Sequence, residues 1–318
     1  MALEQLDYTI ELLEGRGDAA SPAIAVHEAR KALKRLRTLV GLLEPELGAT
    51  NCNREEQVLR EAGLRLAGAR DAEVMLGTLD GLLAGAPKKL ARRRAVVKLR
   101  ARLEAERDRA EERTLGDAAA RIQVLGELRA LRARVARWRL SDRDGIELLE
   151  PGVRDLYRQG RRRYWVAASG KGDTARAMHK WRKRVKDLRY AAEMLDRRAP
   201  GDPNGSGRAT AAHPGGRGSA GGQAERVRRL AREADELAEI LGEDHDLVML
   251  AMRIRARKQP GRGSRPGAKT RRDLMRLIAR RRKLLRKRAL RMGARLFRRP
   301  PKKFVRRLGE AFASASRA

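Results

Sequence analysis

A short basic segment with helical spacing occurs twice in this chain of 318 residues. Residues 26–37 read VHEARKALKRLR, and residues 178–189 read MHKWRKRVKDLR. Apolar positions such as Leu33 and Val185 keep the same offset of 152 residues. The fold must therefore accommodate two equivalent helices, each with a basic and an apolar face. The matched basic positions are His27 and His179, Arg30 and Arg182, Lys31 and Lys183, Lys34 and Lys186, and Arg37 and Arg189.

Two further pairs of segments extend the repeat at larger offsets. Aligning Asp71 with Asp246 gives an offset of 175, and the last pair has an offset of 188. The pairs are LAGARDAEVML at 66–76 with LGEDHDLVML at 241–250, and ARRRAVVKLR at 91–100 with ARRRKLLRKR at 279–288.

The increases in offset coincide with two stretches rich in Gly and Pro, at 199–223 and 258–269. Insertions collect in loops, and neither stretch has the apolar residues that would anchor it to a core. We therefore predict one duplicated domain over 1–318, with flexible loops at these two stretches. Its N-terminal half is 1–140 and its C-terminal half is 147–318.

The periodicity of apolar residues is helical throughout, without the alternation that is typical of strands. Ala, Leu, Arg, Lys and Glu dominate the sequence, and proline falls near the expected helix ends. The sequence therefore predicts an all-α fold. The expected helices are 3–14, 22–44, 52–84, 88–114, 118–139, 147–169, 174–197, 224–257, 269–297 and 302–315.

The chain is strongly basic, with 75 Lys and Arg against 41 Asp and Glu and a formal net charge of +34. Such a surplus repels itself in the compact state and favours a polyanionic partner. No run of residues approaches the length of a membrane span, and acids occupy the N-terminal segment where a signal peptide needs cations. The single cysteine excludes a disulfide within the chain. We expect a cytoplasmic protein with no membrane partner.

The basic positions of each repeat share one face of a helix. Taking His27 as the origin, Arg30, Lys31, Lys34 and Arg37 point to about −60°, +40°, −20° and −80°. Like charges at this spacing destabilise a helix, and a bound polyanion offsets that repulsion. The alternative is a solvated charged face, but two copies on duplicated halves favour binding. We call the five positions from His27 to Arg37 the first ridge and the five from His179 to Arg189 the second ridge.

The sequence leaves two roles open for the histidine of each ridge: it contacts phosphate, or it forms a structural hydrogen bond. His27 and His179 have no neighbouring nucleophile and no second ligand at metal-binding spacing. We therefore predict no catalytic residue, no metal site and no cofactor. Four arginines of the third repeated segment are further candidates for the lining, with exposed solubilising charge as the alternative: Arg93, Arg100, Arg281 and Arg288.

The paired H-x-x-R-K-x-x-K-x-x-R pattern, with ARDAEVML at 69–76, resembles the CHAD family, the conserved histidine α-helical domain. The resemblance implies two four-helix bundles related by pseudo-two-fold symmetry, with both ridges lining a central basic groove or pore. It also implies binding of inorganic polyphosphate, association with polyphosphate granules, and a functional link to a triphosphate-tunnel or polyphosphate-metabolising enzyme.

The leading hypothesis is a non-enzymatic protein that binds polyphosphate through both ridges. The first alternative is a non-specific nucleic-acid-binding protein, although aromatic residues for base stacking make up only 3% of the chain. The second is an enzyme that processes a phosphate polymer, although no cluster of carboxylates is spaced to hold a metal at the ridges.

Overall fold

The computed structural model describes residues 1–17, 19–143, 146–196, 219–256 and 267–313, and these residues form helices and no strand. The predicted all-α class is confirmed. The N-terminal helices are α1 (Ala2–Glu14), α2 (Pro22–Leu42), α3 (Glu44–Leu47), α4 (Ala49–Arg65), α5 (Gly68–Ala84), α6 (Lys88–Ala91), α7 (Arg94–Gly116) and α8 (Ala118–Val135). The C-terminal helices are α9 (Ile146–Ala168), α10 (Thr174–Leu195), α11 (Ser219–Arg255), α12 (Ala268–Leu296) and α13 (Pro301–Ala313).

Local sequence sets where the two ridge helices begin. The hydroxyl of Ser21 accepts a hydrogen bond from the Ile24 amide at 3.3 Å, and Pro22 occupies the first turn of α2. The carboxylate of Asp173 accepts a hydrogen bond from the Arg176 amide at 3.0 Å at the start of α10. Such caps satisfy amide groups that have no partner within the helix. Both ridges therefore start from sequence signals that act without tertiary contacts.

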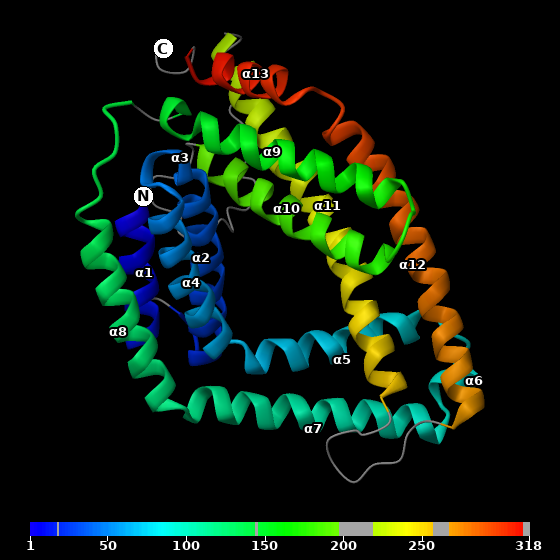
Figure 1. Cartoon of the computed structure of the whole chain (residues 1–318). Coiled ribbons are helices and arrows are strands. Elements are labelled where there is room, and N and C mark those ends of the chain that lie inside the picture. The colour runs from blue at the N-terminus through cyan, green and yellow to red at the C-terminus, as the bar shows by residue number, and fades with distance from the viewer. Residues whose placement is uncertain (18, 144–145, 197–218, 257–266, 314–318) are drawn as a thin grey trace.

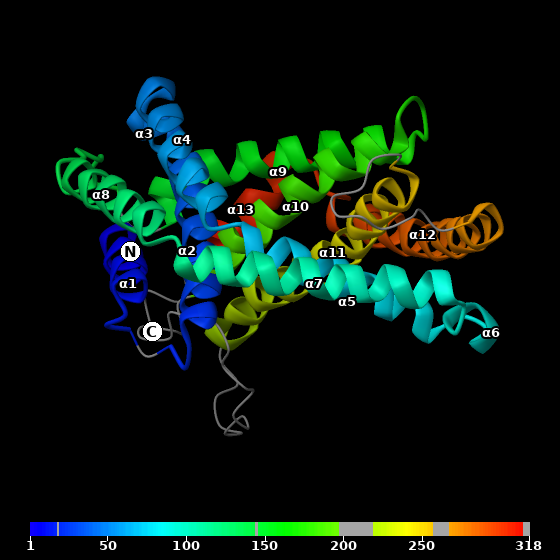
Figure 2. The same ribbon diagram turned by 90° about the horizontal axis from the view of Figure 1, so that it is seen from below.

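The helices pair in the same order in both halves. Helices α1, α2, α4 and α8 pack around one core, and α9, α10, α11 and α13 pack together in the other half. Helices α5 and α7 pair with each other and extend away from the first bundle, as α12 does along α11 in the second (Figure 1). The view from below shows α7 running under the frame toward α11 and α12 (Figure 2). Duplication with pseudo-two-fold symmetry stays a prediction that this pairing supports.

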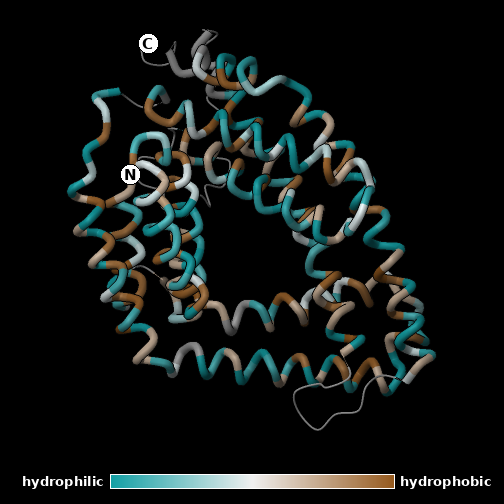
Figure 3. The backbone as a smooth tube through the Cα atoms, in the orientation of Figure 1, coloured by the Kyte–Doolittle hydropathy of each residue, from teal (hydrophilic) through white to brown (hydrophobic). Residues whose placement is uncertain are grey.

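The apolar face of each ridge helix is buried, as the sequence predicted. Leu33 and Leu36 of α2 belong to the first core, and Trp181 and Val185 of α10 belong to the larger core that joins the two halves. Apolar and polar positions alternate along the helices of the frame with amphipathic spacing (Figure 3). None of the helices in the described ranges has an apolar stretch long enough to cross a lipid bilayer.

One continuous helix over 52–84 was a wrong prediction. The chain bends at Leu66 and Ala67, between α4 and α5. The guanidinium of Arg30 donates to the carbonyl of Ala67 at 3.1 Å, so a first-ridge side chain holds a carbonyl at the bend. Helix α11 continues without a break through Gly242, the position that matches Ala67. A contact between distant residues supports the bend, and periodicity could not predict it.

The predicted loops fall largely outside the described residues. Residues 199–218 of the first loop and 258–266 of the second are not described, while α11 begins at Ser219 and α12 begins at Ala268. The joint between the halves lies between α8 and α9, at residues 136–145, of which 144–145 are also outside the description.

Close helix packing in the second half depends on a glycine. A β-carbon on Gly293 of α12 would lie 2.5 Å from the Trp181 ring and 2.7 Å from the Tyr164 ring. Trp181 is fully buried and Tyr164 is nearly so. Well-packed aromatic rings in a core cannot move away at low cost.

We expect Gly293→Ala to lower the free energy of unfolding by about 1–3 kcal/mol, because the new methyl group overlaps two buried rings. Gly126→Ala is the matched control, since Gly126 lies exposed in α8 with open space around it. Its helix should gain up to about 1 kcal/mol from the better helix former. Urea unfolding followed by circular dichroism measures both, and equal stability of the two variants would contradict the packing described.

Candidate functional site

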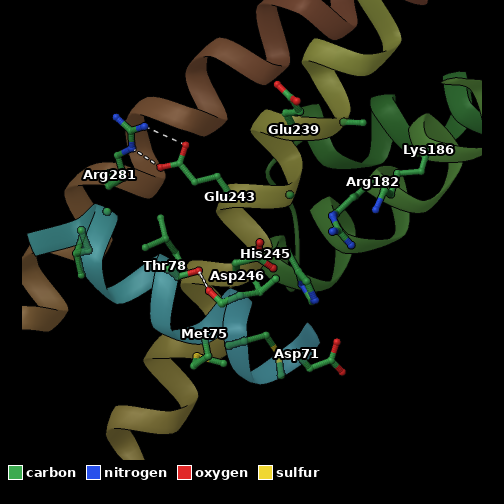
Figure 4. A pocket seen from close by; sticks show the side chains of 18 of the residues that line it. Asp71, Met75, Thr78, Arg182, Lys186, Glu239, Glu243, His245, Asp246 and Arg281 are labelled. Atoms are coloured by element: carbon green, nitrogen blue, oxygen red, sulfur yellow. Dashed lines mark hydrogen bonds and ion pairs between the residues drawn. The ribbon is translucent and has the colours of Figure 1, made fainter. Parts of the chain in front are cut away.

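A cavity of about 1420 Å³ lies between the two halves, with walls from α2, α5, α10, α11 and α12. Four first-ridge residues and three second-ridge residues line it. Figure 4 shows the second-ridge side with α5, α11 and α12 around it. The lining ridge residues are His27, Arg30, Lys31, Lys34, Arg182, Lys186 and Arg189.

Nearby acids orient the first ridge. A guanidinium nitrogen of Arg30 lies 3.6 Å from the Asp71 carboxylate on α5, in addition to its bond to the Ala67 carbonyl. The amine of Lys31 pairs with Glu28 at 3.0 Å, one turn earlier on the same helix. Asp71 lies at the position that the sequence aligned with Asp246. The structure therefore places Asp71 beside Arg30, an arginine of the first ridge.

The second ridge repeats this arrangement in a more buried setting. Burial lowers the pKa of the Arg182 guanidinium, and the Asp246 carboxylate opposes that effect. Arg182 also lies against the backbone of α11, where a β-carbon on Gly242 would be 3.7 Å from a guanidinium nitrogen. Arg189 pairs at 2.6 Å with Glu193 and also with Asp235 of α11. Both arginines are held at the junction of α10 and α11.

The two ridges approach each other at Lys34 and Lys186, which are equivalent positions of the repeat. The pKa of Lys186 is lowered from an ordinary 10.5 to about 7, first by burial and then by the charges of Arg182, Lys34 and Arg189 in that order. Lys34 belongs to the first ridge, and its charge acts on Lys186 because α2 packs against α10. The cavity thus concentrates positive charge where its two halves meet.

Three ridge residues lie outside this cavity. The guanidinium of Arg37 lies near the carboxyls of Glu56 and Asp187, at the junction of α2, α4 and α10. Burial raises the pKa of both carboxyls, while Arg37 and Arg184 oppose the rise. Lys183 is exposed on α10. The charge of Arg37 therefore stabilises two half-buried acids, one from each half.

The third of these residues, His179, forms a pair with another histidine. Its Nδ1 lies 3.2 Å from Nδ1 of His245 on α11, and His245 itself lines the cavity. Burial lowers the pKa of His245 to about 4, and burial also lowers that of His179 beside Lys183 and Arg182. Of the two roles left open by the sequence, His179 therefore has the structural hydrogen bond. The side chain of His27, in contrast, is 43% exposed in the cavity wall.

Of the four additional arginines, one lines the cavity and three lie outside it. Arg281 lines the cavity and forms two bonds to Glu243, at 2.5 and 2.9 Å (Figure 4). Arg93 pairs with Asp273 at 2.7 Å, and Arg100 pairs with Asp80 at 2.8 Å. Arg288 pairs with Glu236. These last three lie outside the cavity and are held by acids.

Sequence reasoning missed the acidic side of the cavity. Glu239 and Glu243 line it together with Asp246, at spacings of four and three residues along α11. That spacing places them on one helix face, and it was visible in the sequence. Arg280 and the buried ring of Tyr190 also contribute to the lining. The site is thus a mixed wall of cations and acids with a surplus of cations.

This arrangement has the side chains that can bind a ligand with several negative charges. Arginine offers bidentate hydrogen bonds to phosphate oxygens, and lysine offers a compact charge. Among the residues that the structure describes, no group of three His, Cys, Asp or Glu side chains is placed to hold a metal ion.

The fold and the cavity define an all-α protein with two opposed basic helices around a central site. The family model of the CHAD domain matches residues 2–206, and the chain belongs to this family. The match includes both ridges and ends before α11. CHAD is a binding domain that occurs in polyphosphate-associated proteins. No curated protein matches the sequence.

We expect Lys186→Met to raise the free energy of unfolding by about 1–3 kcal/mol at pH 6, because it removes a buried charge that faces three cations. The measurement is urea unfolding at low salt without any phosphate compound. Lys183→Met is the matched control, and its exposed side chain predicts a change within about 0.5 kcal/mol. A loss of stability in Lys186→Met alone would show that the amine stabilises the empty site.

Proposed function

We propose that this protein binds inorganic polyphosphate in the central cavity, through the two ridges acting together. The observation that carries the proposal is the convergence of Lys34 and Lys186 from opposite halves on one site. A monoanion would neutralise one side of such a site, whereas a linear polyanion neutralises both. Each phosphate contact also releases condensed counterions, which makes the binding strong and dependent on salt.

The proposal gives unequal roles to the predicted residues. Arg30, Arg182 and the two central lysines would contact phosphate directly, since they line the cavity. His27 would be a lining residue and a hydrogen-bond donor. Arg37 and His179 would act on the site indirectly, because Asp187 and His245 lie against them. Lys183 would act only through its charge, because it is exposed outside the cavity.

The proposal extends to the place of the protein in the cell. A protein that holds polyphosphate without consuming it would collect on polyphosphate granules in the cytoplasm. It would also bring a bound chain to an enzyme that makes or degrades the polymer. These roles follow from binding and require no catalytic group in the cavity.

We expect Lys34→Glu and Lys186→Glu each to weaken polyphosphate binding at least tenfold near physiological salt, because each replaces an attraction with a repulsion at the centre of the site. Arg176→Glu is the matched control, since it makes the same charge change at an exposed position at the start of α10. Calorimetric titration with long-chain polyphosphate measures all three. Unchanged affinity in both lysine variants would place the binding site elsewhere.

A competition experiment separates this function from the alternatives. Labelled polyphosphate should stay bound when single-stranded DNA is added at equal phosphate concentration, because Tyr190 is the one Phe, Tyr or Trp among the described residues that line the cavity, and base stacking needs such rings. Displacement by DNA would indicate a non-specific nucleic-acid-binding protein. Orthophosphate release from the same mixture with Mg²⁺ would indicate an enzyme.

A further inference from the structure

We propose that the site takes up a proton when it binds polyphosphate, and that the amine of Lys186 receives it. This inference rests on the proposed function, because it concerns the same cavity. It adds a property that binding by fixed charges alone does not have. Affinity would depend on pH in the range where arginine stays charged.

Lys186 lines the central cavity together with three other ridge cations, Lys34, Arg182 and Arg189. On its own helix, α10, it is flanked by Arg182 and Arg189 in the cavity wall, and the next residue is Asp187, a half-buried acid that pairs with Arg184. Helix α2 presents Lys34 to it across the cavity. Helix α11 presents the carboxylate of Asp246 and the neutral ring of His245 to it, and Glu239 and Glu243 of the same helix also line the cavity. Three cations thus face this amine from two helices.

The balance of these groups favours the neutral amine in the empty site. Burial is the largest effect on its pKa, the three cations follow, and Asp246 is the smallest of the contributions and acts in the opposite sense. With a pKa of about 7, the amine is largely deprotonated at pH 8. A normal lysine is fully protonated there. Repulsion that would otherwise destabilise the fold is relieved by the loss of one proton.

A bound phosphate chain reverses this balance. A neutral amine directs a lone pair at the anionic oxygens, whereas the ammonium form donates hydrogen bonds to them. The negative charge also screens Lys186 from the opposing cations, which raises its pKa back toward the ordinary value. The amine therefore gains a proton from solvent as the chain binds. No covalent bond forms or breaks in the ligand.

The sign of the pH dependence follows from the proton count. Above pH 7 the empty site lacks a proton that the complex holds, so the affinity falls by up to tenfold per pH unit until the pKa of the complex is reached. Well below pH 7 both states are protonated at this amine, and its contribution to the slope vanishes. His245 and His179 titrate only on the acid side, because their pKa values lie below the ordinary value.

Calorimetric titration of the full chain with long-chain inorganic polyphosphate counts these protons. The titration is run at pH 8 in two buffers that differ in ionisation enthalpy, and the difference in heat gives the protons taken up. We expect close to one proton at pH 8 and much less at pH 6. Tight binding at pH 8 with no proton uptake would overturn the inference and leave the proposed function intact. The absence of binding at both pH values would overturn both.

Two matched variants assign the proton to its residue. Lys186→Arg keeps the charge permanently, since a guanidinium does not deprotonate in this range, and should bind at pH 8 without uptake. Lys34→Arg makes the same exchange at the equivalent position and should retain the uptake. Thermal unfolding of each variant confirms that it is folded. Uptake that persists in Lys186→Arg would assign the proton to another group and overturn the inference even if the wild-type count is one.

Discussion

The contact between α2 and α10 is the constraint on which the rest of the structure depends, because it places two basic ridges face to face. Apolar cores on the far sides of both helices hold them there against the repulsion between their charges. Ion pairs across the contact contribute as well, such as Arg35 of α2 with Glu193 of α10 at 3.6 Å. Arg37 stabilises the same junction beside the half-buried carboxyls of Glu56 and Asp187.

This constraint divides the cations into two kinds. Those with a close acid, such as Arg189 and Arg281, are oriented and largely neutralised by the protein itself. Lys186 faces cations from two helices, and the carboxylate of Asp246 opposes their effect only in part. In the empty site, these cations and burial disfavour the charged form of the Lys186 amine at the centre. Under the proposed function, a bound polyanion would complete the electrostatic balance that the fold leaves open.

The helical pattern predicted much of the fold and of the site. Positions opposite the ridges, such as Leu33 and Trp181, are buried because a helix turns by a fixed angle per residue. The same rule put Arg37 and Lys183 on the basic face, yet neither lines the cavity. A helical wheel gives the direction of a side chain but not the neighbour that meets it. Arg37 lies beside the carboxyls of Glu56 and Asp187, and Lys183 lies exposed in the middle of α10.

The sequence by itself determined the helical class, the start of each ridge helix and the pairing of basic and apolar faces, since caps and periodicity act over a few residues. The tertiary structure decided which charges converge. The meeting of Lys34 with Lys186, the pairing of His179 with His245, and the bend at Ala67 each join residues distant along the chain. Such contacts depend on how helices pack, and packing depends on the whole core rather than on any local pattern.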